Sequence, residues 1–299
     1  MNRVSILAIV GATAAGKSDL ALSIAERLGG EIVNTDAMQV YRGMDIGTAK
    51  LPVAERRGIV HHLLDFMEVT ETASVAEFQR MARAVIADCV ARDVVPVLVG
   101  GSALYTRAIL DEFDFPGTDH VVRARLEAEL EKLGSGELHR RLAEVAPEAA
   151  ARILPGNGRR IVRALEVVEL TGSFTAELPE PSYHYADAVQ IGVDIERPTL
   201  DERIERRVDL MWEQGLVDEV RRLADRGLRQ GRTASRALGY RQVLAFLDGE
   251  ISEEEARRQT VSGTRRFARK QDSWFRNDPR VHWVEPGAVE DALSVLASG

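Results

Sequence analysis

The chain has 299 residues, of which 45% are hydrophobic and 29% are charged, so it can bury a substantial core and is neither disordered nor fibrous. Lys and Arg total 39 against 47 Asp and Glu, and the net charge of −8 excludes a wholly basic nucleic-acid binder. The single cysteine, Cys89, excludes a disulfide framework and a cysteine-based zinc site. Because neither a signal peptide nor an apolar span of about 20 residues is evident, we expect a cytoplasmic protein with no membrane segment.

The first part of the chain alternates short apolar runs with amphipathic segments. The apolar runs are rich in β-branched residues and predict buried strands at residues 4–10, 31–35 and 94–99. Apolar residues at helical spacing predict helices at residues 18–28 and 75–92. This alternation predicts an α/β fold in which helices flank a parallel sheet.

The pattern changes after residue 112. Helical spacing without strand signals continues to residue 188, and strand patterns return at residues 189–195 and 281–284 within a mostly helical remainder. We therefore predict a helical subdomain, residues 113–188, inserted into a core of residues 1–112 and 189–299.

A phosphate-binding motif follows the first predicted strand. Residues 11–18 read Gly-Ala-Thr-Ala-Ala-Gly-Lys-Ser, which fits G-x-x-x-x-G-K-[ST] between a strand and a helix. In this motif backbone N–H groups surround a phosphate, Lys17 neutralises its charge, and the Ser18 hydroxyl can hold Mg²⁺. The motif predicts a P-loop NTPase-like sheet, but it does not show which phosphate ester is bound.

Asp36 is the candidate catalytic carboxylate. It directly follows the second predicted strand, at the carboxyl edge where ligands of open α/β sheets bind. P-loop kinases often place an aspartate after another apolar strand, but here residues 94–99 are followed by Gly100, Gly101 and Ser102. The alternative for Asp36 is a turn residue that only bonds its own backbone.

Three segments are locally basic in this acidic chain. Residues 152–163 contain four Arg and no acid, residues 221–241 contain seven Arg against Asp225, and residues 257–276 contain seven basic residues against Asp272. Such segments suit a polyanion such as RNA, although solvated helix faces have the same composition. His61 and His62 are adjacent, but no further ligand cluster is near in sequence, so local hydrogen bonding is preferred to a metal site.

The ordered set of motifs resembles the bacterial tRNA dimethylallyltransferases, also called tRNA isopentenyltransferases. The resemblance covers nearly the whole chain and is carried by the phosphate loop and by residues 34–50, 61–65, 99–105, 122–125, 160–167, 238–241 and 266–276. It implies transfer of a dimethylallyl group from dimethylallyl diphosphate to N6 of the adenosine 3′-adjacent to the anticodon, in tRNAs that read codons beginning with U. It also implies that the phosphate loop, although it looks like an ATP site, holds the prenyl diphosphate.

The resemblance assigns roles to individual residues. Asp36 is the base that takes the proton from the adenine amine, and Lys17 and Ser102 complete the catalytic set. The diphosphate site comprises Gly11, Ala12, Thr13, Ala14, Ala15, Gly16, Lys17, Ser18 and Arg207. The tRNA contacts comprise Asp36, Ala37, Met38, Gln39, Ser102, Arg123, Arg159, Arg160, Ile161, Val162, Arg163, Arg236, Gly239, Tyr240, Arg241, Arg266, Arg269, Lys270 and Gln271. Mg²⁺ on Ser18 is the expected cofactor, the anticodon stem-loop of tRNA is the expected partner, and the protein is expected to act as a monomer.

Two features modify this expectation. Ala12, Ala15 and Ser102 stand where the family usually has Pro, Ser and Thr, and Ala15 removes a possible hydroxyl contact to diphosphate. An ordinary carboxylate, with a pKa of about 3.9, suffices for Asp36, because the amine becomes acidic only as the new N–C bond forms. A P-loop kinase of a nucleotide or small molecule, and an RNA-binding regulator with a nucleotide switch, are the alternatives that the motifs leave open.

Overall fold

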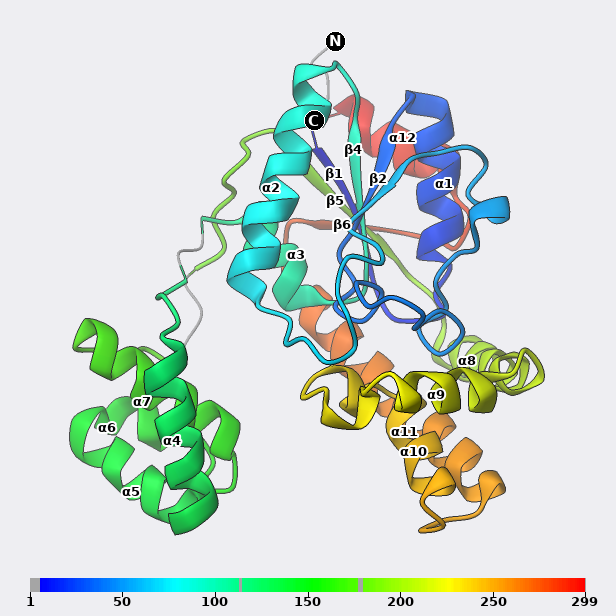
Figure 1. Ribbon diagram of the computed structural model, residues 1–299. Helices are drawn as coiled ribbons and strands as arrows, with labels where there is room; N and C mark the ends of the chain where they lie inside the picture. Colours follow the sequence, from blue (N-terminus) through cyan, green and yellow to red (C-terminus); the bar gives the residue numbers. More distant parts are fainter. Residues whose placement is uncertain (1–5, 113–114, 177–179, 299) are drawn as a thin grey trace. The chain divides into compact units, whose positions relative to one another are not determined.

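The computed structural model describes residues 6–112, 115–176 and 180–298, and the chain divides into two compact units, Met1–Glu112 with Ser182–Gly299, and Phe113–Pro181. The first unit contains a six-stranded, all-parallel sheet in the order β3-β2-β4-β1-β5-β6 (Figure 1). The strands are β1 (Ile6–Val10), β2 (Glu31–Asn34), β3 (His61–His62), β4 (Pro96–Val99), β5 (Ala188–Val193) and β6 (Val281–Val284).

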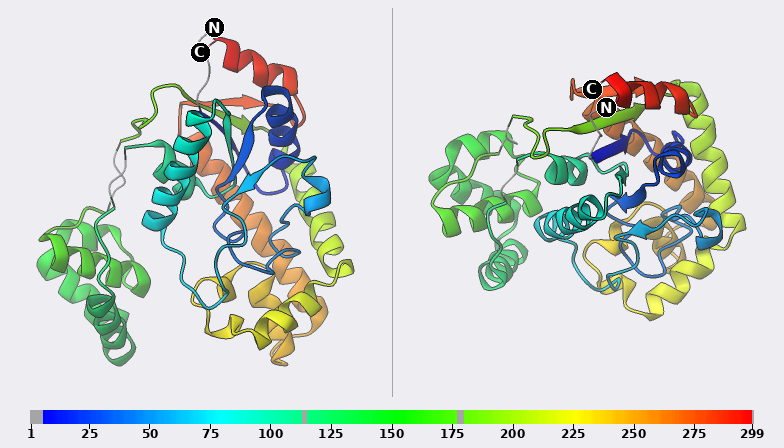
Figure 2. Two further views of the ribbon diagram at one scale, coloured as in Figure 1. Left: turned by 45° about the horizontal axis from the view of Figure 1, so that its top comes forward. Right: turned by 90° about the horizontal axis from the view of Figure 1, so that it is seen from above.

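Helices cover both faces of this sheet (Figures 1 and 2). On one face lie α1 (Lys17–Leu28) and α12 (Val289–Ser298), and on the other lie α2 (Val75–Ala91) and α3 (Ala103–Leu110). The central strand β1 is apolar throughout because alternate side chains enter two cores, Ile6, Ala8 and Val10 one core and Leu7 and Ile9 the other. Each fully buried Leu or Ile stabilises the fold by about 1.5–3 kcal/mol.

The predicted strands and helices of the core are confirmed, with ends that shift by one to two residues, and Val4 and Ser5 of the first predicted strand lie outside the described residues. Two short elements between β2 and α2 were not predicted, β3 and the 3₁₀ helix Val53–Glu55. A two-residue strand has no alternation to detect. It exists because β2 offers its free edge, where Ile32 pairs with His61 and Val33 with His62.

Four helices follow β5: α8 (Arg197–Glu213), α9 (Leu216–Asp225), α10 (Tyr240–Leu247) and α11 (Glu253–Arg276). Two further 3₁₀ turns, Leu228–Gln230 and Ala234–Arg236, connect α9 to α10. The 24-residue helix α11 begins at a Ser252 cap, whose hydroxyl accepts the Glu255 N–H at 3.2 Å. It packs against both α8 and α10, so these helices form one layer of the first unit.

The second unit contains α4 (His120–Leu133), α5 (Ser135–Val145), α6 (Pro147–Arg152) and α7 (Gly158–Thr171) around its own apolar core. It ends at Pro181, so the predicted end at residue 188 is too late, and Phe113, its predicted start, lies outside the described residues. The physical reason is local pairing: the Glu112 N–H donates to the Ser182 carbonyl and the His184 N–H to the Leu110 carbonyl, both at 2.7 Å. Residues 182–187 therefore belong to the sheet-containing unit.

Among residues 6–112, 115–176 and 180–298, no helix combines the length and apolarity that crossing a membrane requires.

Candidate active site

The phosphate loop connects β1 to α1 at the carboxyl edge of the sheet. Gly16 has φ +105°, a conformation that a residue with a side chain rarely adopts, and this bend directs the chain into α1. The N–H groups of Lys17 and Ser18 lie in the first turn of α1, where an α-helix has no internal acceptors for them. The Lys17 ammonium donates to the Ala12 carbonyl at 2.7 Å and closes the loop. The loop thus has the donors and the charge that a phosphate requires.

Two guanidinium groups from α8 contact the same loop. Arg207 approaches the Thr13 hydroxyl at 3.5 Å, and Arg203 donates to the Ala15 carbonyl at 3.3 Å. Arg207 therefore lies beside the loop that the resemblance assigns to diphosphate. Arg203 lies beside the same loop but was not predicted as a site residue. The signal was available, because residues four apart on a helix share one face.

The electrostatics of the loop favour binding of an anion. Burial and the positive charge of Arg207 lower the pKa of Lys17 to about 7, and the charge of Asp36 acts in the opposite direction. Burial also lowers the pKa of the Arg207 guanidinium. A diphosphate would compensate this concentration of positive charge.

Asp36 is held in one orientation at the end of β2. Its carboxylate accepts the Met38 N–H at 2.8 Å. The buried Asn34 side chain accepts the Asp36 N–H at 2.8 Å and donates to the carbonyls of Asp36 at 3.1 Å and Leu63 at 3.0 Å. Asn34 was not predicted as a site residue, although an Asn two residues before the carboxylate is a known turn signal.

The pKa of Asp36 lies above that of an ordinary carboxylate. Burial raises it above the ordinary value, and the Met38 N–H and the Lys17 charge only partly offset this effect. A carboxylate with a raised pKa is a stronger base, which suits proton abstraction. The sequence reasoning did not require a raised pKa, and it could not detect one, because burial cannot be read from the position of a residue after a strand.

The segment after Asp36 is fixed by a buried carboxylate from α9. Glu219 accepts the N–H groups of Asp45 at 3.2 Å, Ile46 at 2.8 Å and Gly47 at 3.3 Å. The Tyr240 hydroxyl donates to the same carboxylate at 2.6 Å. Charge-assisted hydrogen bonds to a buried carboxylate are strong, so the loop of residues 37–50 is held against α9 and α10.

Ser102 is presented by the turn that follows β4. A Cβ atom at Gly100 would lie 2.2 Å from the Thr35 hydroxyl oxygen, so only glycine lets the ends of β4 and β2 approach so closely. Ser102 is half-buried at the start of α3, and its hydroxyl makes no capping hydrogen bond. The hydroxyl is therefore available for a substrate at the same sheet edge as Asp36.

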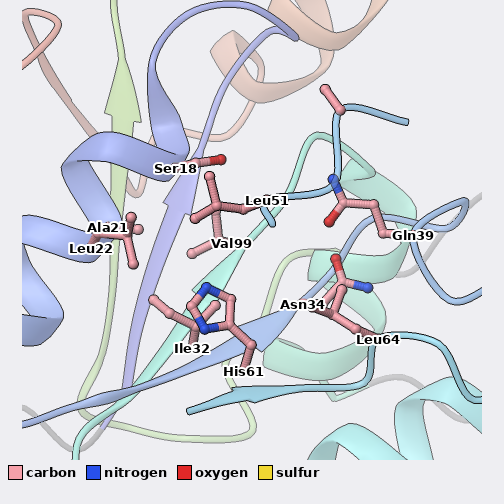
Figure 3. Close-up of a pocket in the computed structure, with 11 residues that line it drawn as sticks. Ser18, Ala21, Leu22, Ile32, Asn34, Gln39, Leu51, His61, Leu64 and Val99 are labelled. Carbon is pink, nitrogen blue, oxygen red and sulfur yellow. The ribbon is translucent and has the colours of Figure 1, made fainter. Parts of the chain in front are cut away.

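A pocket lies beside the phosphate loop (Figure 3). Figure 3 shows Ser18 on one side and Asn34 and Gln39 on the other, with His61 contributed by β3. The remaining lining is apolar and comprises Ala21, Leu22, Ile32, Ala49, Leu51, Leu64 and Val99. A largely apolar lining with a few polar groups is typical of a small-molecule site.

The histidine pair makes local hydrogen bonds. His61 Nδ1 lies 2.8 Å from the Ile59 carbonyl, and His62 Nε2 lies 2.7 Å from a Glu31 oxygen. Cys89 lies near the same carboxylate, but Arg92 already binds both Glu31 oxygens at 2.8 Å. Burial raises the pKa of the Cys89 thiol to about 11, so the thiol is protonated at neutral pH. The contacts of His61 and His62 are thus the local hydrogen bonds that the sequence analysis preferred to a metal site.

The predicted tRNA contacts from Arg123 onward fall into three groups: exposed residues without an ion pair to a described residue, arginines that bond other parts of the second unit, and buried residues. Arg159, Arg236, Arg241, Arg266, Arg269 and Lys270 are exposed, and within the described part of the chain they form no ion pair. Arg160 is exposed and donates to the Ala176 carbonyl at 2.8 Å. Arg123 and Arg163 both bind the buried Glu166 carboxylate, so they stabilise the second unit.

The third group is buried. Ile161 and Val162 belong to the core of the second unit, and Tyr240, Gln271 and Gly239 are buried in the first. The side chains of Ile161, Val162, Tyr240 and Gln271 are covered by the protein in this structure, and Gly239 has no side chain. Sequence motifs cannot separate a residue that contacts a ligand from one that supports the contacting segment.

The parallel sheet has a phosphate loop after β1 and polar residues, Asp36 and Ser102, after β2 and β4. This arrangement defines a P-loop NTPase-like enzyme that binds a phosphate ester. Residues 39–278 match the family model described as IPP transferase, and the chain belongs to this family. It is 66% identical over 301 residues to a Nocardioides protein named tRNA dimethylallyltransferase, covering 99% of this chain and 97% of the relative. A Streptomyces coelicolor protein of the same name is 64% identical over 286 residues, covering 95% of this chain and 91% of the relative.

Solved structures show the same likeness. The tRNA isopentenylpyrophosphate transferase of Bacillus halodurans has 40% identity and a TM-score of 0.72, covering 99% of this chain and 95% of that one. A eukaryotic dimethylallyltransferase acting on tRNA has 23% identity and a TM-score of 0.80, covering 95% of this chain and 74% of that one, and supports the fold alone.

Proposed function

We propose that this protein transfers the dimethylallyl group of dimethylallyl diphosphate to N6 of the adenosine 3′-adjacent to the anticodon, in tRNAs that read codons beginning with U, and releases diphosphate. The observation that carries the proposal is that a phosphate loop with a lysine and a guanidinium, after β1, shares the carboxyl edge of the sheet with the half-buried carboxylate of Asp36, after β2. The relatives' names agree with this chemistry. A tRNA substrate would place the protein in the cytoplasm.

The reaction needs a leaving group and a base. N6 forms a bond to C1 of the dimethylallyl group as the C1–O bond breaks, and the electron pair leaves with the diphosphate. Lys17, Arg207 and the loop N–H groups stabilise the charge that develops there. Asp36 takes the N6 proton, and the Ser102 hydroxyl lies at the same sheet edge to bind the adenine. The apolar lining of the pocket beside Ser18 suits the chemistry of the five-carbon group.

Mg²⁺ fits the exposed hydroxyl of Ser18, because this ion prefers oxygen ligands and binds together with substrate phosphates. When bound, it would supply positive charge to the diphosphate.

The proposal is tested by incubating the protein with labelled dimethylallyl diphosphate or labelled ATP, each with and without unmodified tRNA. We expect label to enter tRNA only from the prenyl donor, and we expect EDTA to stop transfer and Mg²⁺ to restore it. Phosphate transfer from ATP to a small molecule would support a kinase instead, and tRNA binding controlled by ATP without transfer would support a nucleotide switch. Full transfer in EDTA would contradict the role of Mg²⁺.

The two shifted pKa values predict a bell-shaped pH profile. Asp36 acts only when deprotonated, so kcat/KM for dimethylallyl diphosphate rises with pH through a pKa above the ordinary aspartate value. Lys17 binds the anion best when protonated, so kcat/KM falls as pH rises through about 7. Bound diphosphate favours the charged ammonium, so kcat at saturation should fall only at higher pH.

Arg207→Leu tests whether deprotonation of Lys17 causes the fall of kcat/KM at high pH, the basic limb of the profile. Removing this positive charge should move the limb to higher pH, because Arg207 lowers the pKa of Lys17. The position of the limb is independent of any loss in overall rate. A limb that stays in place would show that another group controls it.

The exposed arginines that form no ion pair with the described residues predict the salt dependence of tRNA binding. The triple variant Arg159→Gln, Arg241→Gln and Arg269→Gln should bind more weakly. Its negative slope of log K against log salt should become shallower by about 0.7–0.9 for each phosphate that is no longer neutralised. Arg163 is unsuitable because it holds the buried Glu166. Affinities across a salt series measure the slope.

The matched control removes three exposed arginines that already pair with acids on their own helices. These residues are Arg80, Arg140 and Arg221. The control changes net charge equally and should leave the slope nearly unchanged. A wild-type slope in both triple variants would identify both sets as solvated helix faces.

A further inference from the structure

Gln271 of α11 links two loops of the candidate site. Its Oε1 accepts the Thr13 N–H of the phosphate loop at 2.9 Å, and its Nε2 donates to the Gly101 carbonyl at 2.8 Å. The amide has only one orientation that satisfies both partners, because an N–H can only donate and a carbonyl can only accept. The side chain is 6% exposed, so these bonds replace hydration that it has lost.

The surroundings of the amide are shaped for this contact. A Cβ atom at Gly101 would lie 2.2 Å from Gln271 Nε2, so glycine is required for the amide to reach the carbonyl. Gly101 immediately precedes Ser102, and Thr13 lies in the part of the loop that Arg207 approaches. One side chain thus fixes the spacing between the diphosphate loop and the turn that presents Ser102.

The same helix carries a basic surface. Arg266, Arg269 and Lys270 are exposed on α11 and, within the described ranges, form no ion pairs. Phe267 beside them is 44% exposed and offers a flat ring to an unstacked base. Because an α-helix moves as a stiff rod over these few residues, a ligand that shifts or restrains this surface also acts on Gln271.

We propose that Gln271 is a positioning residue that couples RNA binding on α11 to anion binding in the phosphate loop. RNA bound to the basic surface restrains α11. The Gln271 amide then restrains the Thr13 peptide and the Gly101 turn. As a result, the phosphate loop is held in the form that binds diphosphate. By linkage, diphosphate strengthens RNA binding by the same factor. The inference rests on the proposed function, because it takes RNA as the ligand of α11.

The test measures the affinity for an anticodon stem-loop RNA with and without inorganic diphosphate, which cannot react. In the wild type we expect diphosphate to tighten RNA binding, within the range of about 5–150-fold that couplings between sites usually span. In Gln271→Met, which keeps the side-chain length but removes both hydrogen bonds, the factor should fall to near one. The reciprocal titration, diphosphate affinity with and without RNA, must give the same factor.

Gln259→Met is the matched control. Gln259 lies on the same helix, and among the described residues its amide bonds Glu255 alone, at 2.7 Å, so the chemical change is identical but neither loop of the site is affected. Its coupling factor should equal that of the wild type. If Gln271 had a merely structural role, Gln271→Met would weaken the binding of RNA and of diphosphate alike and would leave the coupling factor unchanged. This result would overturn the proposal.

Gly101→Ala provides a second route if Gln271→Met fails to fold. It keeps Gln271 but displaces its amide, so it should also abolish the coupling. A wild type that binds both ligands without coupling would overturn the inference and leave the proposed transfer intact. Failure to bind RNA at all, or to transfer the prenyl group, would count against the proposed function itself.

Discussion

We expect Asp36→Asn to slow dimethylallyl transfer by about 10²–10⁴-fold, the usual contribution of a general base, while tRNA binding changes little. The amide oxygen can still accept the Met38 N–H that now holds the carboxylate at 2.8 Å, so the turn should keep its shape. What the variant lacks is the basic oxygen that takes the N6 proton. Single-turnover rates with saturating tRNA and prenyl donor measure this loss directly.

The matched control is Asp19→Asn, which removes an exposed carboxylate from the first turn of α1. It should leave the rate within a few-fold of wild type. The acidic limb of the pH profile should disappear with Asp36→Asn and persist with Asp19→Asn, because Asp36 has the raised pKa. Near wild-type turnover of Asp36→Asn would show that another group accepts the proton.

The sheet could be predicted because each central strand is buried on both faces. The runs at Ile6–Val10 and Pro96–Val99 are apolar at every position, a pattern that a partly exposed strand does not have. β3 has no such pattern, and its two residues are half-buried. It forms only because β2 has an unpaired edge, which is a property of the assembled sheet.

The local part of the site could also be predicted. The phosphate loop and Asp36 each depend on a few consecutive residues, and the turn chemistry is encoded there. The supports of the site are of a different kind. Glu219 bonds the N–H of Gly47, 172 residues away in sequence, and Gln271 bonds that of Thr13, 258 residues away. No local pattern encodes such a pair.

Tyr240 and Gln271 illustrate the consequence. Both lie in segments that resemble the tRNA-contacting motifs of the family, yet both are buried and hold loops that line the site. Their neighbours Arg241 and Lys270 are exposed. A motif therefore contains residues that present a surface and residues that attach this surface to the catalytic loops, and only the structure separates them.

Lys17→Ala should lower kcat by about 10²–10³-fold, as is usual when one group that stabilises developing negative charge is removed. The ammonium both attracts the bound diphosphate and stabilises it as the C1–O bond breaks, so KM for the prenyl donor should rise as well. Because the pKa of Lys17 is about 7, the bound diphosphate must also keep the Lys17 ammonium protonated.

The loss should depend on the donor and not on tRNA. Affinity for tRNA without diphosphate should stay near the wild-type value, and Lys132→Ala, which removes an exposed lysine from α4, should leave both kinetic constants nearly unchanged. Lys17 also closes the loop through the Ala12 carbonyl, so the unfolding temperature of each variant must be measured to separate the missing charge from a loosened loop. A Lys17→Ala protein that used dimethylallyl diphosphate normally but had lost ATP hydrolysis would place ATP, and not the prenyl donor, in the phosphate loop.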